Sequence, residues 1–290
     1  MTALAIAAIL LINFPVHAGQ DVRIFVEAEE ADLAEPRPSA LREALAQGVF
    51  QEAEALLGGE LGEPRRSALR RILEPRAQEY VLDWEEREFL PTEWGAVLHV
   101  NVRVHRQALR GFLQSLGTYY TRNNVIGYRL EARGLNAEQT EVIRNLEVLS
   151  GVRQDGADSL ILRLNSQADG SLQGTLDYEG LVWSAMGPEL PEVWIGLWSN
   201  YFGMDRVRRT FEDDMILDTH GWTAAGDVQS FDQALREWEV SVDRIDLLGI
   251  SMQPDGLLQA RWRIVTTDRS GMQSRVRQYF QNRDVAYSVQ

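Results

Sequence analysis

The spacing of apolar residues changes repeatedly along this chain, and this change constrains its fold more than any other sequence feature. Val22, Ile24 and Val26 alternate as in a half-buried strand, whereas Leu41 and Leu45 begin a run at helical spacing. The same two periods predict later strands and helices. The strands are expected near residues 80–84, 98–104, 125–130, 160–164, 172–183, 215–217, 248–252 and 258–264, and the helices near residues 69–73, 109–116, 136–149, 190–201 and 230–238.

This mixture predicts an α+β fold made of two or three small domains, each an antiparallel sheet with one or two packed helices. A length of 290 residues is sufficient for that number of domains. We expect an export signal at 1–18, a first α+β domain at 19–117, a second module at 118–203 and a third at 204–290.

The second and third modules echo one another in sequence. Leu130–Leu135 resembles Leu217–Trp222, and the hairpin signal Asp169-Gly170 recurs as Asp255-Gly256. The pattern predicts that the third module is a repeat of the second.

Local signals also predict where individual elements begin. Asn136 with Gln139, and Ser230 with Gln233, have the spacing of helix capping boxes. Ser270-Gly271 has the composition of a turn and predicts a last hairpin.

The composition excludes several classes of protein. Hydrophobic residues make up 44% of the chain, which is enough for packed cores and excludes intrinsic disorder. The net charge is −14 and all 29 basic residues are arginine, so binding to phosphate backbones or anionic membrane surfaces is disfavoured. The chain has no cysteine, which removes disulfides, thiolate metal sites and cysteine nucleophiles.

The first residues have the pattern of a secretory signal peptide. The apolar run from Thr2 to Phe14 is shorter than the roughly 20 residues that span a bilayer. Val16 and Ala18 supply the small residues of a signal-peptidase site. We therefore predict cleavage after Ala18, a periplasmic or secreted location, and no membrane insertion of the mature chain.

Few residues offer catalytic or metal chemistry. His99 and His105, on one predicted strand, are roughly 20 Å apart and cannot share a metal. His220 lies beside a turn and Trp222, and we include both among possible interaction residues. The acidic stretch Glu212–Asp214 with Asp218 is open to two interpretations, a cation or glycosidase site and a solvated loop beside arginines; the second is favoured. We predict no enzyme activity, no cofactor and no metal.

Aromatic residues are densest between residues 183 and 202. In a helix after Pro191, the side chains of Trp194, Trp198 and Tyr201 fall on one face, with Trp183 just before it. This stripe can be core, a protein interface or a platform that stacks on sugars. The sequence leaves these three alternatives open.

The first domain resembles the N-terminal domain of flagellar assembly protein T. The resemblance covers residues 20 to about 117 and rests on apolar patterns: Ala44-Leu45 and Val49 in the first helix, Arg76–Val81 leading into a strand, the strand Val97–Val104, and Leu109 and Leu113 in a closing helix. It implies a periplasmic, non-enzymatic protein in a ring around the flagellar basal body, with no catalytic residues.

Taken together, these features predict an exported, non-catalytic scaffold that acts through protein contacts, in a flagellar basal body or another cell-envelope complex. Its partners are expected to be envelope proteins and not nucleic acid, and an oligomer is compatible with the sequence. The alternative is a periplasmic protein that binds or processes glycan or peptidoglycan through the region from Trp183 to Tyr201.

Overall fold

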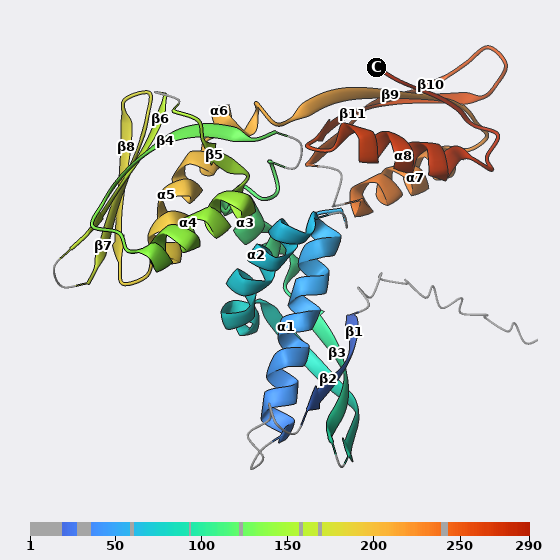
Figure 1. Cartoon of the computed structure of the whole chain (residues 1–290). Coiled ribbons are helices and arrows are strands. Elements are labelled where there is room, and N and C mark those ends of the chain that lie inside the picture. Colours follow the sequence, from blue (N-terminus) through green and yellow to red (C-terminus); the bar gives the residue numbers. More distant parts are fainter. Residues whose placement is uncertain are drawn as a thin grey trace, which may run out of the picture.

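A computed structural model gives the architecture of the chain (Figure 1). The structure describes residues 19–27, 36–58, 61–92, 94–121, 124–156, 159–167, 170–238 and 243–290. The predicted signal peptide and Asp169 lie outside the described residues. The predicted α+β fold is confirmed: three sheets, rich in antiparallel pairing, each have helices packed against them.

The first sheet has the strand order β1-β3-β2 and is antiparallel throughout. Its strands are β1 (Gln20–Glu27), β2 (Val81–Thr92) and β3 (Gly95–Val104). The buried residues of β3 alternate with partly exposed ones, as expected for a sheet with one covered face. Long helix α1 (Pro36–Leu56) covers that face, and Gly48 lets it approach the side chain of Val102 closely.

Three further helical segments connect this sheet to the rest of the molecule. They are α2 (Glu63–Leu73), the 3₁₀ helix η1 (Glu74–Tyr80) and α3 (Arg106–Ser115). The α2 helix packs on α4 (Ala137–Ser150) of the second unit, and α3 packs on α5 (Leu190–Gly203).

The second sheet has the order β5-β4-β6-β7-β8. Its strands are β4 (Ile126–Arg133), β5 (Val152–Gln154), β6 (Leu160–Ser166), β7 (Leu172–Tyr178) and β8 (Leu181–Gly187). β4 runs parallel to both of its neighbours, and the remaining pairs are antiparallel. Helices α4 (Ala137–Ser150), α5 (Leu190–Gly203) and short α6 (Asp205–Arg208) complete this unit.

Two sequence predictions in this unit have different outcomes. The capping box of Asn136 and Gln139 is confirmed, with each side chain accepting from the other residue's backbone N–H. The single strand expected at 172–183 is wrong: the chain turns at Glu179 and Gly180, which both have positive φ angles. Such a two-residue turn joins β7 and β8 into a hairpin.

The third unit has a βαββαβ element order. It consists of β9 (Asp213–Trp222), α7 (Ala225–Glu237), β10 (Arg244–Met252), β11 (Leu258–Thr266), α8 (Arg269–Phe280) and β12 (Ala286–Val289). The strand order β10-β11-β9-β12, with every pair antiparallel, is the ferredoxin-like arrangement. Both helices contribute to a core on one face of the sheet.

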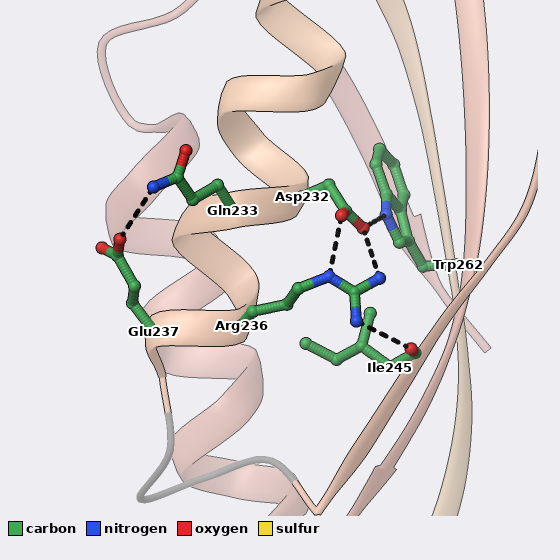
Figure 2. Close-up of polar contacts among 6 residues, drawn as sticks. All are labelled: Asp232, Gln233, Arg236, Glu237, Ile245 and Trp262. Carbon is green, nitrogen blue, oxygen red and sulfur yellow. Dashed lines mark hydrogen bonds and ion pairs between the residues drawn. The ribbon is translucent and has the colours of Figure 1, made fainter. Parts of the chain in front are cut away.

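The capping box and the last hairpin predicted for the third unit are both wrong. The α7 helix begins at Ala225, so Ser230 lies in its interior, and Gln233 donates instead to Glu237 (Figure 2). Ser270 and Gly271 form the first turn of α8, not a hairpin, because the Asp268 carboxylate accepts from the Gly271 N–H at 2.9 Å and caps a helix there.

The predicted repeat does not extend to the sheet topology. Both Gly170 and Gly256 have positive φ and lie in hairpins, as expected. However, the first strand of the β6-β7 hairpin pairs parallel with β4, whereas the second strand of the β10-β11 hairpin pairs antiparallel with β9. The similar turns are therefore placed in differently ordered sheets.

Among the residues that the structure describes, the buried apolar side chains form two clusters. The first runs from Val22 to Val207 and includes side chains of both the first and second units, and the second belongs to the third unit. Within the described residues, no helix is long and apolar enough to cross a membrane.

A polar contact joins the third unit to the shared core of the other two. The Arg110 guanidinium of α3 donates to the Tyr119 hydroxyl and to the Asp243 carboxylate, both at 2.9 Å. Asp243 directly precedes β10. All three side chains are largely enclosed, so the position of the third unit is tied to a specific charged contact.

Candidate functional site

The aromatic stripe of α5 is core. Trp194 and Trp198 are 0% exposed, and the Trp194 indole donates to the Ser150 hydroxyl at 3.0 Å. Tyr128 packs edge-on against both indoles. Of the three alternatives for this stripe, only core is compatible with this enclosure, which corrects the choice of Trp194 and Trp198 as interaction residues and removes the proposed sugar platform.

The other two aromatic residues of this region flank that core. Tyr201 is also buried, and burial raises its pKa to about 12. Trp183 lies in β8 and is only partly buried, opposite Leu176 of β7. Of the four aromatic residues predicted in this region, only Trp183 is partly exposed, on edge strand β8.

The side chains of His220 and Trp222 lie in different environments. The Trp222 indole is buried against Phe231 and Phe280 and donates to the Thr219 hydroxyl at 2.7 Å, so its predicted interaction role is corrected to a core role. His220 is exposed on β9. His105 is not on a strand with His99, because it caps α3 by accepting from the Ala108 N–H at 3.3 Å.

The acidic cluster before and within β9 is paired with arginines of β11. The Asp218 carboxylate is buried and accepts from Arg261 at 2.6 and 3.2 Å. Asp214 pairs with Arg263, whose hydrogen bonds lower the pKa of that carboxyl. Among the described residues, no group of His, Cys, Asp and Glu side chains has the arrangement of a metal site. Asp214 and Asp218 therefore form a cross-strand charge ladder with β11, and the expected solvated loop is corrected, because both residues lie in β9 and Asp218 is buried.

A cavity of about 960 Å³ lies where α2, α4 and the start of α8 meet. Three of its charged residues are engaged within the protein: Arg65 donates to the Leu149 and Thr121 carbonyls, Glu147 accepts from Tyr128 and Gln154, and Asp268 caps α8. The cavity is open to solvent, and its lining is a joint between units.

An exposed apolar row lies on the first sheet and was not predicted from the sequence. Phe25, Val97 and Leu90 lie side by side on β1, β3 and β2, because Val97 is the register partner of both other residues. This row is on the face opposite α1, and Phe25 and Leu90 are 48% and 45% exposed. Trp94, in the turn between β2 and β3, is 77% exposed. We call these four residues the apolar tip.

Charged residues surround the apolar tip on the same sheet face. One register step away, Arg23, His99 and Glu88 form the next row. Near the far end Asp83 pairs with Arg103, and hydrogen bonds from this arginine lower the pKa of the Asp83 carboxyl. An apolar centre with a charged rim is the usual composition of a protein-binding surface.

The apolar residues of this surface are visible in the sequence, but they belong to three strands that are separated along the chain. The alternation of Val22, Ile24 and Val26 accounts for only one face of β1, and Phe25 adds an apolar side chain to the other face. Only the pairing of three strands shows that Phe25, Val97 and Leu90 meet.

Comparison with protein-family models finds no matching family, and comparison with curated proteins finds no relative.

Proposed function

We propose that this chain is an exported, non-catalytic scaffold that binds a partner protein of the cell envelope through the apolar tip. The observation that carries the proposal is the cross-strand row of Phe25, Val97 and Leu90 next to exposed Trp94. Exposed clusters of large apolar side chains within a charged rim mark interaction sites on folded proteins.

The position of the tip supports this proposal. Helix α1 packs along β1 and β3 and covers one face of the sheet, and a partner can contact the opposite face. Figure 1 shows the β2-β3 hairpin projecting from the end of the first unit that is distant from the second and third units. A partner can therefore contact the tip without displacing either of the other sheets.

The location and assembly remain part of the proposal. The predicted signal peptide with cleavage after Ala18 supports a periplasmic or secreted protein. The resemblance of residues 20 to 117 to the N-terminal domain of flagellar assembly protein T makes flagellar basal-body proteins the first partners to test.

The test compares two double variants isolated from the envelope fraction of the native cell. Phe25→Ser with Leu90→Ser changes the apolar tip, and Val125→Ser with Met252→Ser makes an equivalent change at exposed apolar sites elsewhere. We expect the first variant to lose co-purifying envelope proteins by at least about tenfold, and the second to retain them.

Equal recovery of the same partners with both variants would overturn the proposed site. Recovery of basal-body proteins, together with loss of motility in a deletion strain, would assign the partner to the flagellum. Recovery of a different envelope complex would keep the site and replace the flagellar assignment.

A further inference from the structure

We infer that the chain forms a homodimer in which β8 of one copy pairs antiparallel with β8 of a second copy, so that the two five-stranded sheets become one continuous sheet. This inference is independent of the apolar tip, because it concerns a different sheet edge. It rests on a comparison of the sheet edges that the described residues form.

Strand edges in folded proteins usually have features that prevent pairing with another chain. β2 carries a run of acids, a proline and two register shifts, and β1 carries Asp21, Arg23 and Glu27. β10 has a bulge and begins with charged residues. β5 and β12 are only three and four residues long.

β8 has none of these features. Its sequence, LVWSAMG, contains no charged residue and no proline, and it pairs with β7 over all seven residues without a register shift. Val182 and Met186, on the sheet face opposite α5, are 58% and 74% exposed. The strand forms the margin of the second unit on the side away from the third unit (Figure 1).

The sequence of β8 is complementary to itself when two copies pair about Ser184. Val182 then lies opposite Met186 of the second copy, which places two exposed apolar side chains in contact. Trp183 lies opposite Ala185, so a large side chain meets a small one on the other face. Because β8 has no charged residue, no like charges lie opposite each other within the two paired strands, although each chain has a net charge of −14.

Helix α5 extends this complementarity below the sheet. Gly196 lies against Ala185, and Gly187 lies beside Glu192, so α5 follows β8 in the reverse direction. Gly196, Ser199 and Gly203 share one partly exposed helix face. Continuing the sheet at its normal strand spacing places the two α5 helices roughly 10 Å apart, which is a helix packing distance that small residues permit.

Charge favours the antiparallel direction. Arg206, paired with Glu179 at 2.7 Å and stacked on Tyr178, lies at the end of β8 where the strand begins. Glu192 lies at the other end, beside Gly187. An antiparallel pair places Glu192 of one copy near the Arg206–Glu179 ion pair of the other, whereas a parallel pair would place the two Glu192 carboxylates together.

The first test uses the mass of the mature chain in solution. We expect the wild type at about 50 µM to have twice the mass of one chain by light scattering. The variant Val182→Lys with Met186→Lys should have the mass of one chain, because lysines on an edge strand oppose pairing. Met252→Lys, on exposed residue Met252 of β10, is the matched control and should stay dimeric.

The second test uses the absence of cysteine in the chain. In the proposed pairing the two Ser184 residues face each other with Cα atoms about 4.5 to 5.5 Å apart, which is within the range that a disulfide joins. We expect Ser184→Cys to form a covalent dimer on mild oxidation, and Ser251→Cys on β10 to form at least about tenfold less. Circular dichroism of all variants reports whether they remain folded.

A wild type that has the mass of one chain at about 50 µM would overturn the inference. So would a folded Val182→Lys, Met186→Lys variant that remains dimeric, or equal crosslinking through Ser184→Cys and Ser251→Cys. None of these results bears on partner binding at the apolar tip, which is tested by separate variants.

Discussion

Helix α5 and the apolar tip use the same kinds of side chain in opposite ways. In α5, Trp194 and Trp198 recur at helical spacing and are fully enclosed by Tyr128 and the second sheet. At the apolar tip, Phe25 and Leu90 lie in strands and remain about half exposed. In this chain, a dense local run of aromatic residues indicates core. The exposed apolar surface forms only where strands that are distant in sequence pair.

The apolar residues of α5 are buried and those of the tip are exposed because the two elements are covered differently by the rest of the chain. An amphipathic helix must bury its apolar stripe to be stable, so a dense stripe is most often core. A three-stranded sheet has two faces, and α1 covers only one of them. On the other face, Phe25 and Leu90 remain about half exposed, and this makes the tip a candidate for binding.

The largest expected effect is a loss of folding stability at alkaline pH, which depends on buried tyrosines of the core and not on the apolar tip. Burial raises the pKa of Tyr80, Tyr120 and Tyr201 to about 12, from an unfolded value near 10. Between these values the folded state keeps protons that the unfolded state has lost, so stability is full below pH 10 and is lost as pH rises toward 12. Tyrosinate absorbance should therefore increase together with unfolding; titration of all tyrosines near pH 10 in a folded chain would contradict the burial.

The next largest effect is expected at α5 itself. Trp198→Ala should lower the free energy of unfolding by about 3 to 5 kcal/mol, because it removes a fully buried indole and leaves a cavity. The measurement is urea unfolding followed by circular dichroism. A loss below about 1 kcal/mol would show that α5 is not packed as described.

A smaller loss of stability is expected when a buried indole of the third unit loses its hydrogen-bond acceptor. The Trp262 indole donates to the Asp232 carboxylate at 3.0 Å, and Arg236 holds this carboxylate from the next helical turn (Figure 2). Asp232→Ala should cost about 1 to 3 kcal/mol by leaving the indole N–H without an acceptor. Asp232→Asn keeps an acceptor oxygen and should cost less, so equal losses would rule out this explanation.

The smallest effect on stability is expected at the apolar tip. Trp94→Ala should change the free energy of unfolding by less than about 0.5 kcal/mol, because the indole is mostly exposed. The same urea experiment used for Trp198→Ala measures it. A loss comparable to that of Trp198→Ala would place Trp94 in a core and end the contrast between the two regions.

Local sequence patterns predicted much of the fold, and the errors have identifiable physical causes. The alternation in β3 and the box of Asn136 and Gln139 were sufficient to place those elements. The turn at Glu179-Gly180 was missed because glutamate rarely adopts positive φ. The start of α8 was mistaken for a turn because Ser270 and Gly271 are common in turns, and the Asp268 cap that starts the helix was not recognised.

The candidate site was less predictable than the fold. Trp194 and Trp198 were selected from the sequence for aromatic density and Trp222 for its place beside His220 and a turn, and all three proved to be core. Phe25 and Leu90 are separated by long stretches of chain and meet only through the registers of β1 and β2 with β3. Non-local pairing of this kind cannot be read from one strand at a time.

The most direct test of the central proposal is a photo-crosslinking amino acid placed at position 94 in the native cell, with the same group at position 252 as control. Trp94 and Met252 are almost equally exposed; Trp94 lies in the turn between β2 and β3, and Met252 lies on β10 of the third unit. We expect a discrete covalent adduct between position 94 and one envelope protein, and none of that mass from position 252. No adduct at position 94, or the same adducts at both positions, would contradict a partner site at the apolar tip.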